Sequence, residues 1–204
     1  MTPRKYDQRL RAEAAEETRR RILDAVYERL REAPSEKVSV DRVARMAGVA
    51  RSTVYLVFGS RQGLFGALAT DLLQRGGFQS MMEASAHPDA REGLRRGIRG
   101  VVTMYAAHRD VTRALLSMAH LDPDAVGGAV DRMERGRAVG AVYRAERLVE
   151  QDILRADVTL DEAADLLWLL TGFDSFDLLY TGRSLSVDKV AEALATTAER
   201  SLCR

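Results

Sequence analysis

Residues 38–65 read VSVDRVARMAGVARSTVYLVFGSRQGLF, and this stretch decides the fold of the N-terminal part of the chain. It predicts one helix that begins after Ser39, a residue type that caps helix N-termini, and ends at Gly48, which suits a left-handed C-terminal cap. A second short helix is expected over residues 50–58, where Gly59 ends it. Two short helices joined by a glycine turn predict a helix-turn-helix, whose second helix enters the major groove of DNA.

The two sides of the second helix differ in chemistry. At 3.6 residues per turn, the side expected to face the core holds Ala50, Val54, Val57 and Phe58. The outer side holds Ser52, Tyr55 and Leu56, with Arg51 at its flank. An exposed leucine is unusual on a solvated face, but an apolar group can contact the thymine methyl, and arginine pairs with guanine. This side therefore predicts a surface that reads bases.

A third helix is expected to begin at Ser60, with Arg61 in its first turn. A helix N-terminus beside an arginine can bind a phosphate group. The alternative for the whole stretch is a compact three-helix unit with a polar outer face and no DNA contact. The order of cap, glycine turn, Thr53–Tyr55 and Ser60–Arg61 favours the DNA-binding interpretation.

The segment AGVARSTVYLVFGSRQGLF, residues 47–65, resembles the DNA-binding signature of the TetR family of transcriptional regulators. The resemblance covers roughly residues 18–66 and, beyond them, only the length and helical layout. It implies an all-α fold of about nine helices, in which an N-terminal three-helix DNA-binding domain precedes a C-terminal ligand-binding and dimerisation domain. It also implies these roles: Thr53 and Tyr55 at phosphates, Arg51, Ser52 and Leu56 towards bases, and Ser39 and Arg61 on the DNA backbone.

Three positions depart from the family pattern. Ala50 replaces the usual serine cap, which forgoes ~0.5–2 kcal/mol. Arg61 replaces a lysine and keeps the charge. Gly63 replaces a better helix former, which is expected to weaken the third helix by ~1 kcal/mol relative to alanine. These departures bear on local stability more than on function.

Composition limits the class of protein. The chain has 204 residues, of which 46% are hydrophobic and 30% charged, enough for one or two small domains with a core. Few prolines and abundant Ala, Leu and Arg predict an all-α chain. No apolar run reaches the ~18 residues of a membrane span, and the N-terminus lacks the apolar region of a signal peptide. A single cysteine, Cys203, suits a reducing cytoplasm.

Charge is unevenly distributed along the chain. Residues 1–66 hold 14 Lys plus Arg against 9 Asp plus Glu, which gives +5, and residues 67–204 hold 17 against 21, which gives −4. A basic end on an acidic body is typical of a protein whose N-terminal module meets DNA. We therefore expect a basic extension at 1–17, a DNA-binding domain at 18–66 and a ligand-binding and dimerisation domain at 67–204.

The N-terminal extension has two interpretations. It carries Arg4, Lys5, Arg9 and Arg11, and the first helix is expected to begin near Thr18. The extension is then either a solvated tail or a basic arm that reaches the minor groove or adds phosphate contacts.

The second half predicts a homodimer. The segment LLWLLTGF, residues 166–173, is apolar nearly all the way round, and such a helix is buried on more than one side. The last helix carries one apolar stripe. Two such helices and their symmetry mates would form a four-helix bundle, as the resemblance also implies. The expected interface residues are Leu166, Leu169, Phe173, Val190, Leu194 and Leu202. The alternative is a core formed within one chain.

A ligand pocket is the least specific prediction. Met and aromatic residues at helical spacing are more often core, but together they suggest a site for an apolar or aromatic small molecule with a histidine or tyrosine anchor. The candidates are Met81, Met104, Tyr105, His108, Met118, His120, Tyr143, Trp168 and Phe176. Arg113 or Arg144, if either were inside, would favour an anionic ligand.

Other functions are disfavoured. The histidines, His87, His108 and His120, show no metal-ligand spacing, and no phosphate-binding or dinucleotide-binding loop is present. We expect no cofactor, metal or catalytic residue. The preferred hypothesis is a ligand-responsive repressor that binds a palindromic operator as a homodimer. The alternative is a helical dimeric module that binds a small molecule or a protein without binding DNA.

Overall fold

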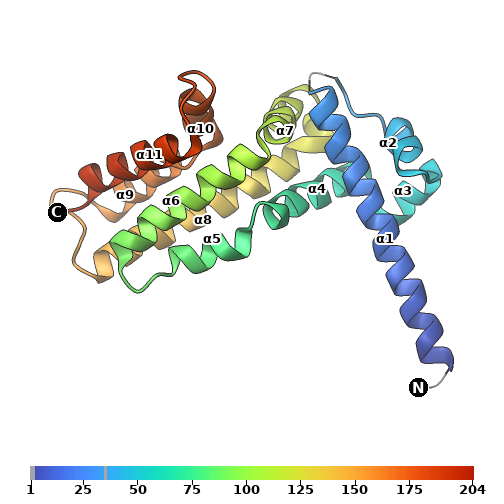
Figure 1. Ribbon diagram of the computed structural model, residues 1–204, viewed down its shortest axis with the longest axis horizontal. Coiled ribbons are helices and arrows are strands. Elements are labelled where there is room, and N and C mark those ends of the chain that lie inside the picture. Colours follow the sequence, from blue (N-terminus) through green and yellow to red (C-terminus); the bar gives the residue numbers. More distant parts are fainter. Residues whose placement is uncertain (1–2, 35) are drawn as a thin grey trace. The chain divides into compact units, whose positions relative to one another are not determined.

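The computed structural model describes residues 3–34 and 36–204, which form an all-α protein without a β-strand (Figure 1). The elements are α1 (Pro3–Glu32), α2 (Val40–Ala47), α3 (Arg51–Phe58), α4 (Arg61–Arg75), α5 (Phe78–Ser85), α6 (Ala90–Ala107), α7 (Arg109–Leu121), the π-helical η1 (Pro123–Gly127), α8 (Gly128–Glu150), α9 (Leu160–Leu170), α10 (Phe173–Tyr180) and α11 (Val187–Leu202). The all-α prediction is confirmed.

The predicted number of about nine helices is too low for the described residues, which form eleven α-helices. The sequence analysis missed α5, which begins directly after Gly77, a residue with φ of 76°. It also treated residues 166–173 as one helix, whereas Gly172 adopts an extended conformation and separates α9 from α10.

The chain divides into two compact units. Unit 1 consists of Met1–Asp71 and Asp110–Val130, and unit 2 of Leu72–Arg109 and Asp131–Arg204. Neither unit is continuous in sequence, because α7 and η1 group with the N-terminal helices. The boundaries expected at residues 17 and 66 mark functional segments and stay a prediction.

In unit 1, α1 is longer than predicted. It begins at Pro3 rather than near Thr18, because the segment is rich in strong helix formers and proline is tolerated in a first turn. The side chains of residues 8–17 are exposed, and Arg9 pairs with Glu13 one turn further on at 3.2 Å. Among the α1 side chains that the structure describes, from residue 8 onwards, the buried apolar ones begin at Ile22, and this second half of the helix packs on α2.

In unit 2, α6 packs against both α5 and α11 (Figure 1). The inner face of α6 is formed by Leu94, Ile98, Val101 and Tyr105, which recur at helical spacing and are all buried. The N-terminus of α9 has a capping box: Glu162 N donates to Thr159 Oγ1 at 3.2 Å, and Thr159 N donates to the Glu162 carboxylate at 2.8 Å. None of the described helices is both long enough and apolar enough to cross a membrane.

Candidate nucleic-acid interface

The turn between α2 and α3 has the geometry that the sequence predicts. Gly48 has φ of 65°, a left-handed conformation in which glycine carries no Cβ penalty. Arg21 of α1 donates a hydrogen bond to the carbonyl oxygen of Ala47 at 3.4 Å, which fixes the end of α2. Val54, on the inner side of α3, is buried. The Arg19 guanidinium of α1 lies 4.9 Å from the centre of the Phe58 ring of α3. These contacts hold α3 in place by its inner side.

The outer side of α3 is exposed and chemically mixed. Leu56 is 86% exposed, and Arg51 and Ser52 are also exposed. Tyr55 and Thr53 are half-buried at the edges of this surface. All five α3 residues that are predicted to contact DNA therefore lie on one short helix. Four of them, Arg51, Ser52, Tyr55 and Leu56, lie on its outward side.

The Arg51 guanidinium contacts two neighbouring side chains, Asp41 and Tyr55. Its Nη1 lies 3.2 Å from Asp41 Oδ2, and its Cζ lies 5.7 Å from the centre of the Tyr55 ring. The pKa of Arg51 is raised, first by a hydrogen bond to Tyr55 and then by the Asp41 carboxylate. Arg51 itself stays exposed, so these two contacts orient its guanidinium without burying it.

Arg61 has a partner that the sequence did not reveal. Its Nη2 donates to Asp122 Oδ2 at 2.8 Å, and Asp122 lies 61 residues further along the chain, directly after α7. The Asp122 side chain is only 16% exposed. The residue predicted to bind phosphate is thus paired with an acid of its own unit in this structure.

The starts of α2 and α4 match the sequence prediction only in part. Ser39 is exposed at the N-cap of α2 but makes no side-chain capping hydrogen bond. Ser60 caps α4 as predicted, since the Gly63 N–H donates to its Oγ at 3.0 Å. Gly63 is not a weak substitute for alanine: a Cβ there would lie 2.0 Å from the Phe58 carbonyl oxygen, so the close approach of α3 and α4 requires glycine.

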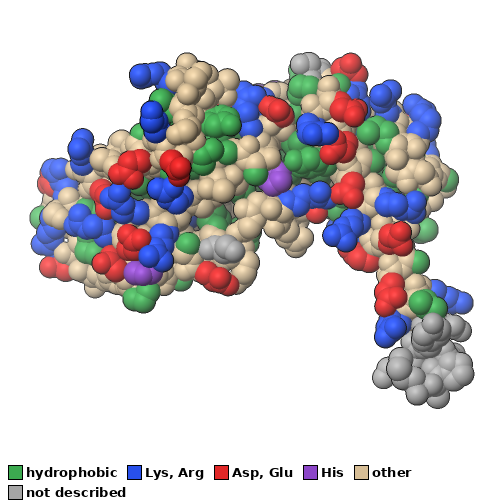
Figure 2. Space-filling view, viewed as in Figure 1, with side chains coloured by type: hydrophobic (Ala, Val, Ile, Leu, Met, Phe, Trp, Pro, Cys, Tyr) green, Lys and Arg blue, Asp and Glu red, His purple; other side chains and the backbone are tan. Residues whose placement is uncertain are grey.

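Charge on the drawn face of unit 1 is mixed, with basic and acidic side chains interspersed (Figure 2). Arg9 and Arg11 are exposed on the protruding half of α1, whereas the side chains of Arg4 and Lys5 lie outside the described residues. A DNA contact by this segment therefore stays a prediction, but as a helix rather than an extended arm.

The residues predicted for a ligand pocket are distributed over both units. Met118 and His120 belong to unit 1, and the remaining seven belong to unit 2. Tyr105 and Phe176 are buried in an aromatic cluster with Phe173, with ring centres 5.3–6.0 Å apart. Tyr105 donates its hydroxyl to Thr171 O at 3.3 Å, and burial raises the pKa of Tyr105 to about 12. This cluster has the packing of a core.

The other predicted pocket residues of unit 2 have separate surroundings. Met81 and Met104 are half-buried, and each lies against a glycine, Gly100 and Gly76. His108 and Tyr143 are half-buried as well. Trp168 is 42% exposed and lies beneath the Arg137 guanidinium at 4.8 Å.

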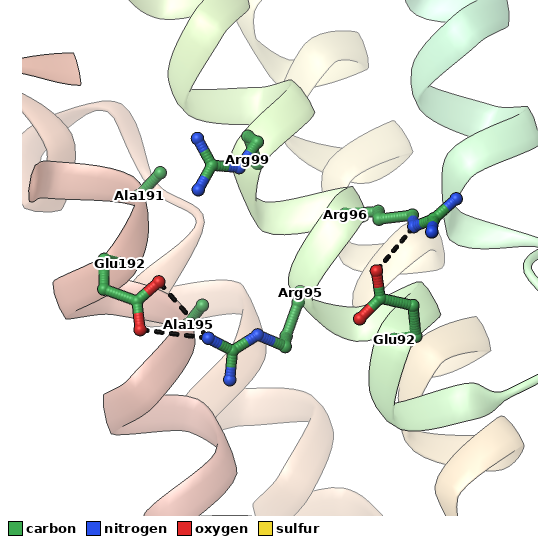
Figure 3. Close-up of a pocket in the computed structure, with 7 residues that line it drawn as sticks. All are labelled: Glu92, Arg95, Arg96, Arg99, Ala191, Glu192 and Ala195. Carbon is green, nitrogen blue, oxygen red and sulfur yellow. Dashed lines mark hydrogen bonds and ion pairs between the residues drawn. The ribbon is translucent and has the colours of Figure 1, made fainter. Parts of the chain in front are cut away.

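A shallow groove of about 140 Å³ lies elsewhere, between α6 and α11 (Figure 3). It is lined by Glu92, Arg95, Arg96, Arg99, Ala191, Glu192 and Ala195, none of them a predicted pocket residue. Each of its arginines reaches a carboxylate: Arg95 to Glu192 at 2.9 Å, Arg96 to Glu92 at 2.7 Å and Arg99 to Asp188 at 2.6 Å. Every guanidinium that lines this groove is therefore already paired with a carboxylate.

The predicted dimer interface needs correction. Phe173, Val190, Leu194 and Leu202 are at most 5% exposed, so they belong to the core of the chain itself and are not a surface for a partner. An amphipathic pattern does not distinguish a stripe that faces its own chain from one that faces a second copy. Leu166 is half-buried, and Leu169 is 61% exposed. The other exposed large apolar side chains of α9 and α10, none of them predicted for the interface, are Leu160, Trp168 and Leu178.

Residues 22–68 match the family described as bacterial regulatory proteins, tetR family. No protein of curated function matches the chain. The fold is similar to that of a TetR-like transcriptional regulator from Rhodococcus sp. RHA1, at 23% identity over 90% of this chain and 94% of that one, with a TM-score of 0.64.

Two further solved structures share the fold. A putative TetR-family regulator from Syntrophomonas wolfei is 14% identical over 90% of this chain and 94% of that one, with a TM-score of 0.73. NalD of Pseudomonas aeruginosa, described as the secondary repressor of the MexAB-OprM multidrug efflux pump, is 23% identical over 94% of this chain and 98% of that one, with a TM-score of 0.68.

Proposed function

We propose that this chain, whose residues 22–68 are a DNA-binding domain of the tetR family, is a ligand-responsive repressor that binds a palindromic operator as a homodimer. The observation that carries the proposal is the outer face of α3. A leucine that is 86% exposed beside an exposed arginine and serine offers one apolar group and two hydrogen-bonding groups on the same outward side, and this combination suits contact with base edges in the major groove.

The DNA contacts are divided by their chemistry. Arg51, Ser52 and Leu56 reach base edges and select the sequence, whereas Thr53 and Tyr55 contact phosphates and set the position of α3. Ser39 and Arg61 bind the backbone on either side of that helix. Base contacts specify and phosphate contacts position, so variants of the two groups are expected to differ in their dependence on DNA sequence.

The homodimer is supported by exposed apolar area in unit 2. Trp168, Leu169 and Leu178 are 42%, 61% and 71% exposed on two consecutive helices, and a second copy of this surface would cover them. A two-fold axis presents two α3 helices to two half-sites, and a palindromic site follows from that symmetry. An effector acts by shifting the dimer population between two states. In one state the spacing of the two α3 helices matches the operator, and in the other it does not.

The proposal is tested by selecting binders for the purified protein from random-sequence duplex DNA. The best site is then titrated by fluorescence anisotropy against a scrambled duplex at several salt concentrations. We expect an enriched palindrome, bound at least about 10³-fold more tightly than scrambled DNA. Repression is then measured with a reporter placed behind that site, where occupancy is expected to lower transcription.

A second function is favoured by the same leucine. Leu56 could be covered by a partner protein in a module that no longer binds DNA. In that case the selection from random-sequence DNA would yield no preferred site. Leu56→Ala would then abolish binding of the partner protein and leave any weak, non-specific DNA binding unchanged. An enriched palindrome whose affinity falls in Leu56→Ala would exclude this alternative.

A further inference from the structure

Asp41 is an exposed residue of α2 to which the sequence analysis assigns no contact with DNA. It lies in the first turn of α2, and its carboxylate reaches the first residue of α3, the next helix along the chain (Figure 1). Both carboxylate oxygens contact one nitrogen of Arg51, whose Nη1 lies 3.3 Å from Oδ1 and 3.2 Å from Oδ2. The start of α2 is thus linked to the start of the helix proposed to read bases.

Stability alone does not explain this ion pair. An acidic side chain in a first turn interacts favourably with the helix dipole, which accounts for a carboxylate at position 41 but not for its pairing. The side chains of Arg51 and Asp41 are 58% and 50% exposed. Ion pairs as exposed as this one contribute little to the free energy of unfolding, because water screens them. The consequence of the pair therefore lies in what it does to Arg51.

A carboxylate at this place has a cost for DNA binding. It lies within 3.2 Å of an arginine that is proposed to enter the major groove, and it repels the phosphates of every DNA sequence alike. It also neutralises part of the attraction between Arg51 and phosphate. What the pair does not weaken is the directional hydrogen bonding of the guanidinium to a base. Such an arrangement lowers general affinity and favours specific contacts.

The ion pair leaves one edge of the guanidinium for a base. A guanidinium has two edges with a pair of parallel donors, one formed by Nε and Nη2 and the other by Nη1 and Nη2. Asp41 engages Nη1 alone, so the Nε–Nη2 edge of Arg51 is not part of its ion pair with a described carboxylate. Guanine presents O6 and N7 side by side in the major groove, and these two acceptors match one such edge.

Tyr55 adds a second constraint of a different kind. It lies one turn after Arg51 on the same face of α3, and the centre of its ring is 5.7 Å from the Arg51 Cζ. A ring face attracts a cation but lets it turn in its own plane. The Asp41 carboxylate fixes which nitrogen points towards α2. Together they restrict an otherwise flexible side chain before DNA arrives, and this reduces the entropy lost on binding.

The pair of Arg61 and Asp122 provides a contrast within the same unit. There the carboxylate engages Nη2 at 2.8 Å, and Nη2 belongs to both two-donor edges of a guanidinium. The Asp122 side chain is also only 16% exposed. Asp122 therefore withholds the nitrogen that a guanine would need, whereas Asp41 engages the opposite nitrogen through longer and exposed contacts. The first geometry withdraws an arginine, and the second directs one.

We propose that Asp41 is a positioning residue that makes Arg51 selective for guanine. It holds the guanidinium by Nη1, so that Nε and Nη2 bind O6 and N7 of one guanine in each half-site, and it disfavours contact of the same arginine with phosphate. The inference rests on the proposed function, because it names the base that Arg51 reads and the residue that directs the reading. Asp41 acts through Arg51 and makes no contact with DNA.

The test uses the full-length protein, first in the selection from random-sequence duplexes. The selected palindrome is then titrated by fluorescence anisotropy. It is compared with duplexes in which each guanine of the half-site is replaced symmetrically by the other bases, and with a scrambled duplex at several salt concentrations. The variants are Asp41→Asn, Arg51→Ala and the two combined. The matched control is Glu32→Gln, which removes the same charge at the exposed end of α1. Thermal midpoints without DNA verify that each variant folds.

We expect one guanine whose replacement weakens binding of wild type about 5- to 100-fold. Asp41→Asn should reduce that preference about two- to fivefold, the range expected for losing one exposed ion pair. The same variant should bind scrambled DNA more tightly, with a steeper salt dependence. Arg51→Ala should lose the preference, and adding Asp41→Asn to it should change the preference no further. Glu32→Gln should keep the preference of wild type.

The contrary outcomes are distinct. An enriched palindrome whose guanine preference is unchanged in Asp41→Asn would overturn the inference and leave the proposed function intact. A sharper preference in Asp41→Asn would mean that Asp41 withholds Arg51 from the base. An effect of Asp41→Asn on base preference that persists in the Arg51→Ala background would mean that Asp41 reads a base itself. A wild type that selects no site would refute the proposed function, and the inference with it.

Discussion

At the scale of single residues, the outer face of α3 separates two kinds of contact. Tyr55 and Arg51 touch each other, with the Arg51 Cζ 5.7 Å from the Tyr55 ring, yet they are assigned different tasks. Tyr55→Ala is expected to weaken binding to all DNA sequences about equally. Arg51→Ala is expected to relax preference at particular base positions, by roughly 1–3 kcal/mol. Anisotropy titrations on the operator and on its single-base variants distinguish the two patterns.

The control for this pair is Arg31→Ala, which removes an exposed arginine at the end of α1, far along the chain from α3. It should leave both affinity and base preference unchanged. Equal loss of preference in Tyr55→Ala and Arg51→Ala would mean that the two side chains act as one unit.

Arg61 and Asp122 allow a second residue-scale prediction. Because the Asp122 carboxylate competes with DNA phosphate for the Arg61 guanidinium, Asp122→Asn should tighten DNA binding and steepen its salt dependence by about one phosphate contact. The measurement is the slope of the logarithm of affinity against the logarithm of salt concentration. In an Arg61→Ala background the same substitution should have no effect, and an effect there would show that Asp122 acts by another route.

At the scale of elements, the junction of α3 and α4 depends on one close approach. Gly63→Ala should destabilise the protein by roughly 1–3 kcal/mol, because its Cβ would lie 2.0 Å from the Phe58 carbonyl oxygen. Gly136→Ala is the matched control, since a Cβ at that position in α8 meets nothing within 4 Å and should stabilise the helix by ~1 kcal/mol. Urea unfolding measures both, and a stabilised Gly63→Ala variant would contradict the observed junction.

The protruding half of α1 supports another prediction at this scale. Residues 8–17 are exposed and add little to the core, so deleting residues 1–11 should leave the thermal midpoint nearly unchanged. If this helix contacts phosphates, the deletion should lower operator affinity and flatten its salt dependence. An unchanged salt slope would assign the segment to solvent.

At the scale of the whole molecule, the proposed homodimer depends on the exposed apolar side chains of α9 and α10. Leu169→Glu combined with Leu178→Glu should convert a dimer into a monomer, because two charges would enter an apolar interface. The monomer should also bind the operator more weakly, because it can contact only one half-site. Sedimentation equilibrium measures the mass. Leu121→Glu, at a 57% exposed leucine of unit 1, is the control, and a monomeric wild type would contradict the proposed assembly.

What the sequence by itself determined was local in origin. The cap at Gly48, the capping box of Thr159 and Glu162, and the outward position of Leu56 each depend on residues within about one helical turn. Helix periodicity and capping act over such distances, so a short segment carries the full signal. The helix-turn-helix was therefore predicted correctly from a stretch of 28 residues, 38–65.

Only the tertiary structure decided what depends on distant partners. The pairing of Arg61 with Asp122 spans 61 positions, and the contact of Arg144 with Ser85 spans 59. Which helices pack together decides whether Val190 and Leu194 face their own chain or a second copy. It also decides whether an arginine side chain is buried in the interior of the protein. A linear pattern records that a side of a helix is apolar or charged but not what covers it, because burial is a property of the neighbours that folding brings together.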